Sequence, residues 1–146
     1  MKPALSYICL CSIITILVSG CRPSESSSSI TDFGTIVCEV FYRPSAGGGF
    51  EEAPATTFAG GYEEKDLRFE NMSFHAGFQD DQYEGRALSV AVTDLETGAD
   101  ISRQLYQFDP QNPPENQFIG GHGFSGLQYV FHPDSGAEIQ YFCSVK

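Results

Sequence analysis

Alternation of apolar and polar residues is the main pattern of this chain from residue 35 onward. In residues 35–43, the apolar side chains of Ile36, Cys38, Val40 and Tyr42 occur at every second position. This period is typical of a β-strand with one buried face. Similar segments recur, and no stretch longer than ten residues has helical periodicity. The pattern predicts seven strands, at residues 35–43, 56–58, 67–78, 86–93, 101–108, 124–131 and 137–145.

Proline, glycine and aspartate separate these segments. Residues 44–55 contain Pro44 and three consecutive glycines, and residues 109–123 contain three prolines, so both are predicted to be long loops. Residues 132–136, with proline early and glycine late, predict a tight reversal between the last two strands. The alternation slips near Asn71 and Met72, which predicts a bulge inside the strand at 67–78.

These elements predict an all-β fold. Six or seven short strands joined by glycine, proline and aspartate turns favour a two-sheet antiparallel β-sandwich, with an immunoglobulin-like outline as one form of it. The chain has no tryptophan, so the core tryptophan of immunoglobulin domains is missing. A small β-barrel is the alternative. Residues 33–146 are enough for one domain.

A different pattern precedes the strands. Lys2 is followed by an uncharged apolar run at residues 8–18, which is typical of a secretory signal. The run is shorter than the roughly 20 apolar residues that a transmembrane helix needs. It ends in Val18-Ser19-Gly20-Cys21, which resembles the lipobox of bacterial lipoproteins.

The resemblance covers residues 1–21 and implies that the chain is cut before Cys21. The cysteine would then carry a diacylglycerol on sulfur and an acyl chain on its amino group, and several acyl chains anchor a protein stably. Residues 1–20 would be the signal peptide and the serine-rich residues 21–32 a flexible tether. The alternative is an ordinary secreted protein in which Cys21 has no such role.

The lipoprotein resemblance also implies a location. The protein would be attached by lipid to the bacterial cell envelope. Arg22, rather than aspartate, follows the modified cysteine, which in enterobacterial lipoproteins favours the outer membrane or cell surface over the inner membrane.

The cysteine count agrees with this organisation. Cys9 and Cys11 lie in the leader, and a lipid on Cys21 leaves only Cys38 and Cys143. In an oxidising compartment these two are predicted to form a disulfide, which would bring the first and last strands together. Two unpaired buried thiols are the alternative.

The charge of the chain excludes one class of partner. The full sequence has 8 basic and 19 acidic residues, and loss of the leader removes one lysine, which leaves a net charge of −12. Such a surface is solvated and disfavours nucleic acid.

Residues that would support catalysis or metal binding are few. Asp80, Asp81 and Glu84 concentrate carboxylates in a turn, which makes them weak candidates for Ca²⁺, although an acidic turn is more often only solvated. The histidines at 75, 122 and 132 match no zinc spacing. No nucleophile motif is present. We therefore expect no cofactor and a protein that is not an enzyme, with a hydrolase using Asp80 or His122 as the least favoured alternative.

The favoured function is a binding or structural domain that meets another envelope protein. Long loops on a rigid scaffold commonly carry function, so residues 44–55 and 109–123 are predicted to form the contact surface. Binding candidates in the second loop are Phe118, Ile119 and His122. The alternative is a small ligand or glycan, with stacking platforms at Tyr62, Tyr83 and Tyr106.

Overall fold

The computed structural model describes residues 34–81, 83, 85–109, 112 and 114–146, so the signal, Cys21 and the whole tether lie outside the described residues. The fold is all-β: within these ranges there is no helix, and therefore none that could span a membrane. The strands are β1 (Ile36–Arg43), β2 (Glu51–Glu52), β3 (Thr56–Phe58), β4 (Tyr62–Arg68), β5 (Met72–Asp81), β6 (Gly85–Asp94), β7 (Asp100–Phe108), β8 (Gln128–Phe131) and β9 (Glu138–Val145).

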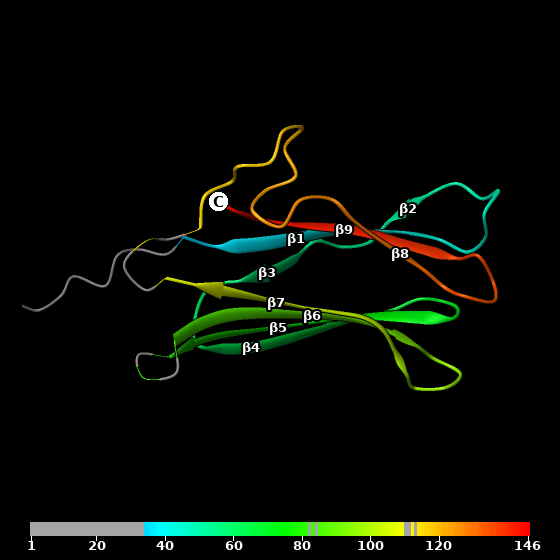
Figure 1. Ribbon diagram of the computed structural model, residues 1–146, viewed down its shortest axis with the longest axis horizontal. Coiled ribbons are helices and arrows are strands. Elements are labelled where there is room, and N and C mark those ends of the chain that lie inside the picture. Colours follow the sequence, from blue (N-terminus) through cyan, green and yellow to red (C-terminus); the bar gives the residue numbers. More distant parts are fainter. Residues whose placement is uncertain (1–33, 82, 84, 110–111, 113) are drawn as a thin grey trace, which may run out of the picture.

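The strands form two antiparallel sheets that lie one above the other (Figure 1). Sheet A has the order β2-β1-β9-β8, and β3 also pairs with β1. Sheet B is a simple meander in the order β4-β5-β6-β7. The sheets do not close into a barrel, and the predicted β-sandwich is confirmed.

The sequence missed two details of this arrangement. The loss of alternation near Asn71 marks a hairpin and not the predicted bulge: the Phe69 N–H donates to the Met72 carbonyl at 2.9 Å, and β4 and β5 pair on either side of the turn. A short strand, β2, also forms inside the predicted loop 44–55. The described chain therefore has nine strands where six or seven were predicted.

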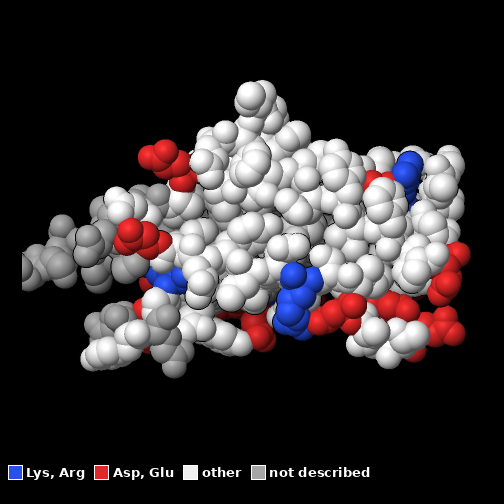
Figure 2. Space-filling model, viewed as in Figure 1, with Lys and Arg blue, Asp and Glu red and all other residues white. Residues whose placement is uncertain are grey.

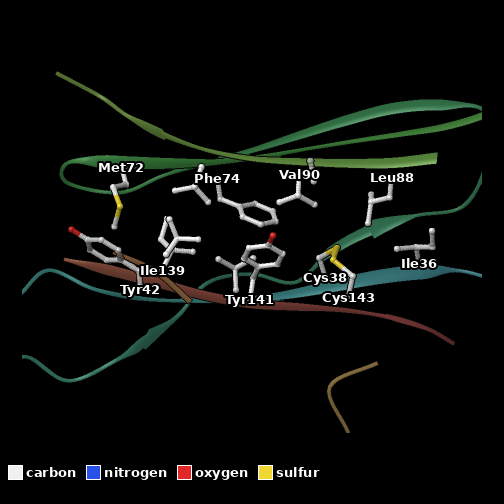
Figure 3. Close-up of a cluster of buried hydrophobic side chains, with 14 of the residues drawn as sticks. Ile36, Cys38, Tyr42, Met72, Phe74, Leu88, Val90, Ile139, Tyr141 and Cys143 are labelled. Atoms are coloured by element: carbon white, nitrogen blue, oxygen red, sulfur yellow. A yellow bond between two sulfur atoms is a disulfide. The ribbon is translucent and has the colours of Figure 1, made fainter. Parts of the chain in front are cut away.

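The core lies between the sheets, where the alternating apolar residues of both sheets meet (Figure 3). Phe74 from sheet B packs edge to face on Tyr141 from sheet A, with ring centroids 5.2 Å apart. Such pairs add about 0.5–1.5 kcal/mol beyond the burial of their area. Burial also raises the pKa of the Tyr141 hydroxyl, because the phenolate would be desolvated.

A disulfide joins Cys38 and Cys143 inside this core, as predicted (Figure 3). The two residues are direct register partners on the neighbouring strands β1 and β9. Thr35 and Lys146 exchange two backbone hydrogen bonds, so by alternation the Cys38 and Cys143 pair is a non-hydrogen-bonded one, in which side chains lie closest. Their Cα atoms are 4.1 Å apart. The bond therefore lies within sheet A, whereas immunoglobulin domains have theirs between sheets.

We predict that the Cys38→Ala, Cys143→Ala double variant folds but is less stable by about 2–5 kcal/mol, because the disulfide closes a long loop in the unfolded chain. Urea denaturation followed by tyrosine fluorescence measures this. The wild-type protein in reducing agent is the matched control and should reproduce the loss. Equal stability of the wild type with and without reductant would contradict the prediction.

Candidate binding surface

The outer face of sheet A carries aromatic side chains where a solvated sheet usually carries polar ones. Tyr129 and Phe131 on β8 are each 55% exposed. Phe41 on β1 and Phe142 on β9 are partly exposed and stack with ring centroids 6.4 Å apart. Sheet pairing places Phe41 and Tyr129 on either side of Gln140. We call Phe41, Tyr129, Phe131 and Phe142 the aromatic face.

The opposite surface of the sandwich shows the usual pattern. The outward positions on the two central strands of sheet B hold small or polar residues: Ser73, His75, Gly77, Gln79, Ala87, Ser89, Ala91 and Thr93. The aromatic face is therefore a property of sheet A, and the fold itself does not require it, because the core already fills the space between the sheets.

A buried ion pair lies at one end of the aromatic face. Arg43 pairs with the carboxylate of Glu138, which is buried and also accepts a hydrogen bond of 2.7 Å from the Gln140 amide. The Arg43 guanidinium also lies over the Phe50 ring, 5.0 Å from its centroid. A buried carboxylate is costly without such partners. The pair thereby holds Phe50, and with it the loop 44–55, against the outer side of sheet A.

The second predicted loop also stands on this side of the sandwich. Figure 1 shows residues 114–123 rising from sheet A away from sheet B. Ile119 at its tip is 97% exposed and Phe118 about half exposed. His122 packs edge to face on Phe142, with ring centroids 5.3 Å apart. The loop thus connects directly to the aromatic face through His122.

Side-chain hydrogen bonds fasten this loop to the part of β9 that extends beyond its pairing with β8. The Asn116 amide pairs with both backbone groups of Val145, at 2.7 and 2.9 Å. The Ser125 hydroxyl accepts from the Cys143 N–H at 2.7 Å. Gly123 has a φ of +62°, and a Cβ atom there would lie 2.1 Å from the Cys143 carbonyl oxygen. Only glycine can make this approach, so the base of the loop is fixed although its tip is exposed.

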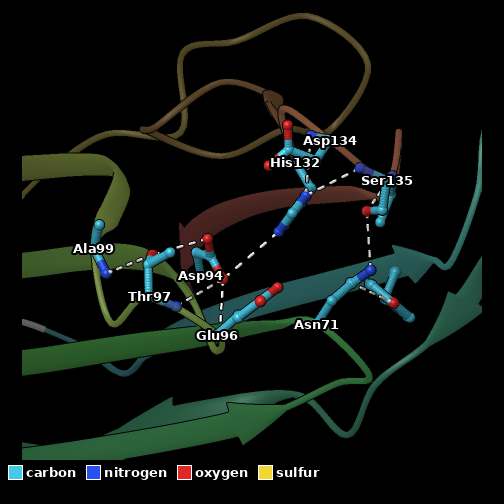
Figure 4. Close-up of polar contacts among 10 residues, drawn as sticks. Asn71, Asp94, Glu96, Thr97, Ala99, His132, Asp134 and Ser135 are labelled. Atoms are coloured by element: carbon cyan, nitrogen blue, oxygen red, sulfur yellow. Dashed lines mark hydrogen bonds and ion pairs between the residues drawn. The ribbon is translucent and has the colours of Figure 1, made fainter.

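A polar cluster joins the sheets at the end of the sandwich where three turns meet (Figure 4). Asn71 accepts from the Tyr42 hydroxyl and donates to the Ser135 hydroxyl, each at 2.9 Å. Asp94 accepts from the Glu96 N–H at 2.7 Å, and its Oδ1 lies 3.7 Å from Nε2 of His132. We call this group the turn cluster.

His132, at the start of the reversal predicted for residues 132–136, is buried in the turn cluster. Its Nδ1 accepts from the backbone N–H groups of Asp134 and Ser135, at 3.3 and 3.2 Å, which leaves Nε2 to carry the proton toward Asp94. An open depression of about 480 Å³ lies beside it, lined by Glu70, Asn71, Asp94, Leu95, Glu96, His132, Asp134 and Ser135. The sequence signal was the histidine at the start of a His-Pro-Asp-Ser-Gly turn, where its ring can reach those N–H groups.

The acidic turn is the place predicted for Ca²⁺. The Asp80 carboxylate accepts from Arg86 Nε at 2.5 Å, and Asp81 accepts from the Tyr83 N–H at 2.7 Å. Glu84 lies outside the described residues. Within the part of the chain that the structure describes, no three histidine, cysteine or acidic side chains gather as metal ligands.

The structure does not bring the other candidate residues together. His75 contacts Asp66 on the outer face of sheet B, His122 lies on the aromatic face, and His132 is in the turn cluster. Among the tyrosines, Tyr62 and Tyr83 are exposed, whereas Tyr106 packs on Phe124. Tyr106 is partly buried against the core, and burial raises the pKa of its hydroxyl.

Comparison with known proteins gives no further assignment of this surface. No family model matches the chain. No curated protein and no solved structure matches it either.

We predict that Asp94→Asn lowers the melting temperature at neutral pH. Hydrogen bonds from the Glu96 N–H and the Thr97 hydroxyl lower the pKa of Asp94 below its usual 3.8, so its stabilising effect is present above about pH 4 and disappears as the pH falls through the folded-state value. Thermal denaturation at several pH values should therefore show a deficit at pH 7 that narrows toward pH 3. Glu96→Gln, an exposed neighbour, is the control, and an equal effect of both variants would contradict the prediction.

Proposed function

We propose that this chain is a bacterial lipoprotein, anchored at Cys21, whose β-sandwich binds another envelope protein without catalysing a reaction. The observation that carries this proposal is the aromatic face of sheet A, flanked by residues 44–55 and 114–123 of the two predicted loops. Aromatic side chains are enriched at protein interfaces because they supply large, rigid contact area. Here they are backed by a disulfide-linked sheet, so little ordering is needed on binding.

The distribution of charge supports a protein partner at this face. In the view of Figure 2, acidic side chains gather toward sheet B and the ends of the molecule, while the protruding tip of the loop is uncharged. Charged side chains on the outer face of sheet A are Glu39, the register partner of Phe142, and the Arg43 and Glu138 pair, which neutralise each other. A contact surface with few net charges and a charged periphery is the usual anatomy of a protein interface.

The position of the N-terminus is compatible with a membrane tether. Figure 1 shows that β1 begins at the end of the sandwich opposite to the turn cluster. A chain anchored through residues before Gly34 would therefore hold the turn cluster away from the membrane. The aromatic face and both loops would then lie on the flank of the domain, where a neighbouring envelope protein can reach them.

We predict that Cys21→Ala abolishes lipid attachment. Wild-type protein expressed in a bacterial host with a palmitate analogue should carry the label, and the variant should not. Intact mass measures the same difference. A wild-type chain that is unlabelled and freely secreted would contradict the anchor.

We also predict that a photo-reactive residue at Ile119 cross-links to a specific envelope protein in intact cells. The same residue at Tyr83, which is 88% exposed but lies in the turn between β5 and β6, is the matched control. Tyr129→Ser should weaken the adduct at position 119 at least about tenfold, because interface aromatics contribute the most binding energy. Equal adducts from positions 119 and 83 would contradict this assignment.

A glycan is the second candidate, and one observation favours it. Tyr62 is 71% exposed beside a small cleft of about 100 Å³ on the outer face of sheet B, where Gly77 and Ser89 are among the lining residues and Leu105 stands on the far side. Tyr62 also donates a hydrogen bond to Glu64, which raises the pKa of Tyr62. A sugar ring could stack there, whereas a partner of the aromatic face would not touch it. A glycan array probed with the wild-type protein and with Tyr62→Ala separates the two functions, because only glycan binding would need Tyr62.

A further inference from the structure

The free edges of the two sheets are protected unequally. Exposed strand edges invite pairing with other chains, and proteins usually guard them by shortness or by charge. In sheet A, the peripheral strands β2, β3 and β8 have only two, three and four residues. In sheet B, β4 carries charges at five of its seven positions. The remaining edge, β7, has neither protection.

β7 is a long and nearly neutral edge strand. It has nine residues, and among the described residues it pairs only with β6. Its two charged side chains, Asp100 and Arg103, bind each other at 2.7 Å. Leu105 near its centre is 61% exposed. A strand of this kind would be expected to attract another extended segment.

The backbone groups that face this free edge can be identified from the ladder. The Asp94 N–H donates to Ala99 across the β6–β7 turn, and the Leu95 N–H donates to Asn71 on the other side. Since hydrogen-bonded pairs alternate, even-numbered residues of β6 bond to β7. Their register partners are Ser102, Gln104, Tyr106 and Phe108. The N–H and C=O groups of Arg103, Leu105 and Gln107 therefore point to the free edge.

An aromatic pocket lies at the C-terminal end of the same strand. Tyr106 and Phe108 pack edge to face on Phe124, at 5.7 and 5.2 Å between centroids. These rings line an open pocket of about 420 Å³. The carboxylates of Asp109 and Glu115 are also at the pocket. A side chain of an added strand could enter it, and a basic neighbour would be favoured by the two acids.

We propose that β7 is a strand-addition site that binds an extended, basic segment of a partner protein. Main-chain bonds to Arg103, Leu105 and Gln107 supply the affinity, and the aromatic pocket selects an apolar side chain. A second copy of this acidic chain is disfavoured as the occupant, because two chains that each have a net charge of −11 repel each other. This site is separate from the aromatic face, so a negative result at one of the two sites does not affect the proposal for the other.

Amide hydrogen exchange measured by NMR tests the proposal on the wild-type domain. The probe is a ten-residue peptide of alternating lysine and valine with one central phenylalanine, at about 1 mM. Exchange should slow at least about tenfold at the Arg103, Leu105 and Gln107 amides and change little at Gln104, which already bonds to β6. Unchanged exchange at the three amides would overturn the proposal. Dimerisation of the free protein that protects the same amides would overturn the assignment to a partner.

Matched variants separate the backbone from the side chain. Leu105→Pro removes an N–H that faces the free edge, and it should reduce peptide affinity at least tenfold, whereas Leu105→Ala should stay within about twofold. Glu64→Pro makes the same change on the guarded edge strand β4 and should leave affinity unchanged. Equal losses from Leu105→Ala and Leu105→Pro would show that the Leu105 side chain, and not strand addition, carries the binding. A glutamate-for-lysine peptide that binds equally well would overturn the basic character of the segment.

Discussion

The structure depends on the pairing of its first and last described strands. β1 and β9 run antiparallel over eight register pairs, and the Cys38 to Cys143 disulfide lies inside that pairing. Closing a loop of about 100 residues is worth about 4.7 kcal/mol in the chain-entropy treatment. The segment between the two strands must therefore fold back on sheet A. The four-stranded meander of this segment, sheet B, does so by burying one apolar face against the inward side chains of β1 and β9.

This arrangement divides the molecule into parts with different roles. The inward faces hold the two sheets together, and the disulfide links β1 to β9 within sheet A. The turn cluster of Asn71, Asp94, His132 and their partners connects the sheets at one end. None of these contacts uses the outer face of sheet A. The aromatic residues there, and the loop tip at Ile119, are free to serve recognition without a change in the core. Rigid support beneath exposed aromatic residues is what a preorganised interface requires.

The alternation of apolar and polar residues predicted the sandwich well, because it shows directly that one face of each strand is buried. Strands such as β1, β6 and β9 show it clearly, and the two cysteines fell on inward positions. The charged strand β4 was missed because its sequence, YEEKDLR, contains few apolar residues that could show alternation. It is extended because it pairs with β5. The aromatic face, the burial of His132 and the open edge of β7 depend on strand order. No local pattern in a single sequence carries that information.

The central claim is that the aromatic face of sheet A contacts an envelope partner while the rest of the fold serves as its scaffold. Hydrogen exchange with mass spectrometry, comparing the lipidated protein in native envelope membranes with the isolated domain, tests this most directly. The account predicts slower exchange in residues 114–131 and 138–145 and no change in residues 72–94 of sheet B. Identical exchange in both samples, or protection confined to sheet B, would contradict it.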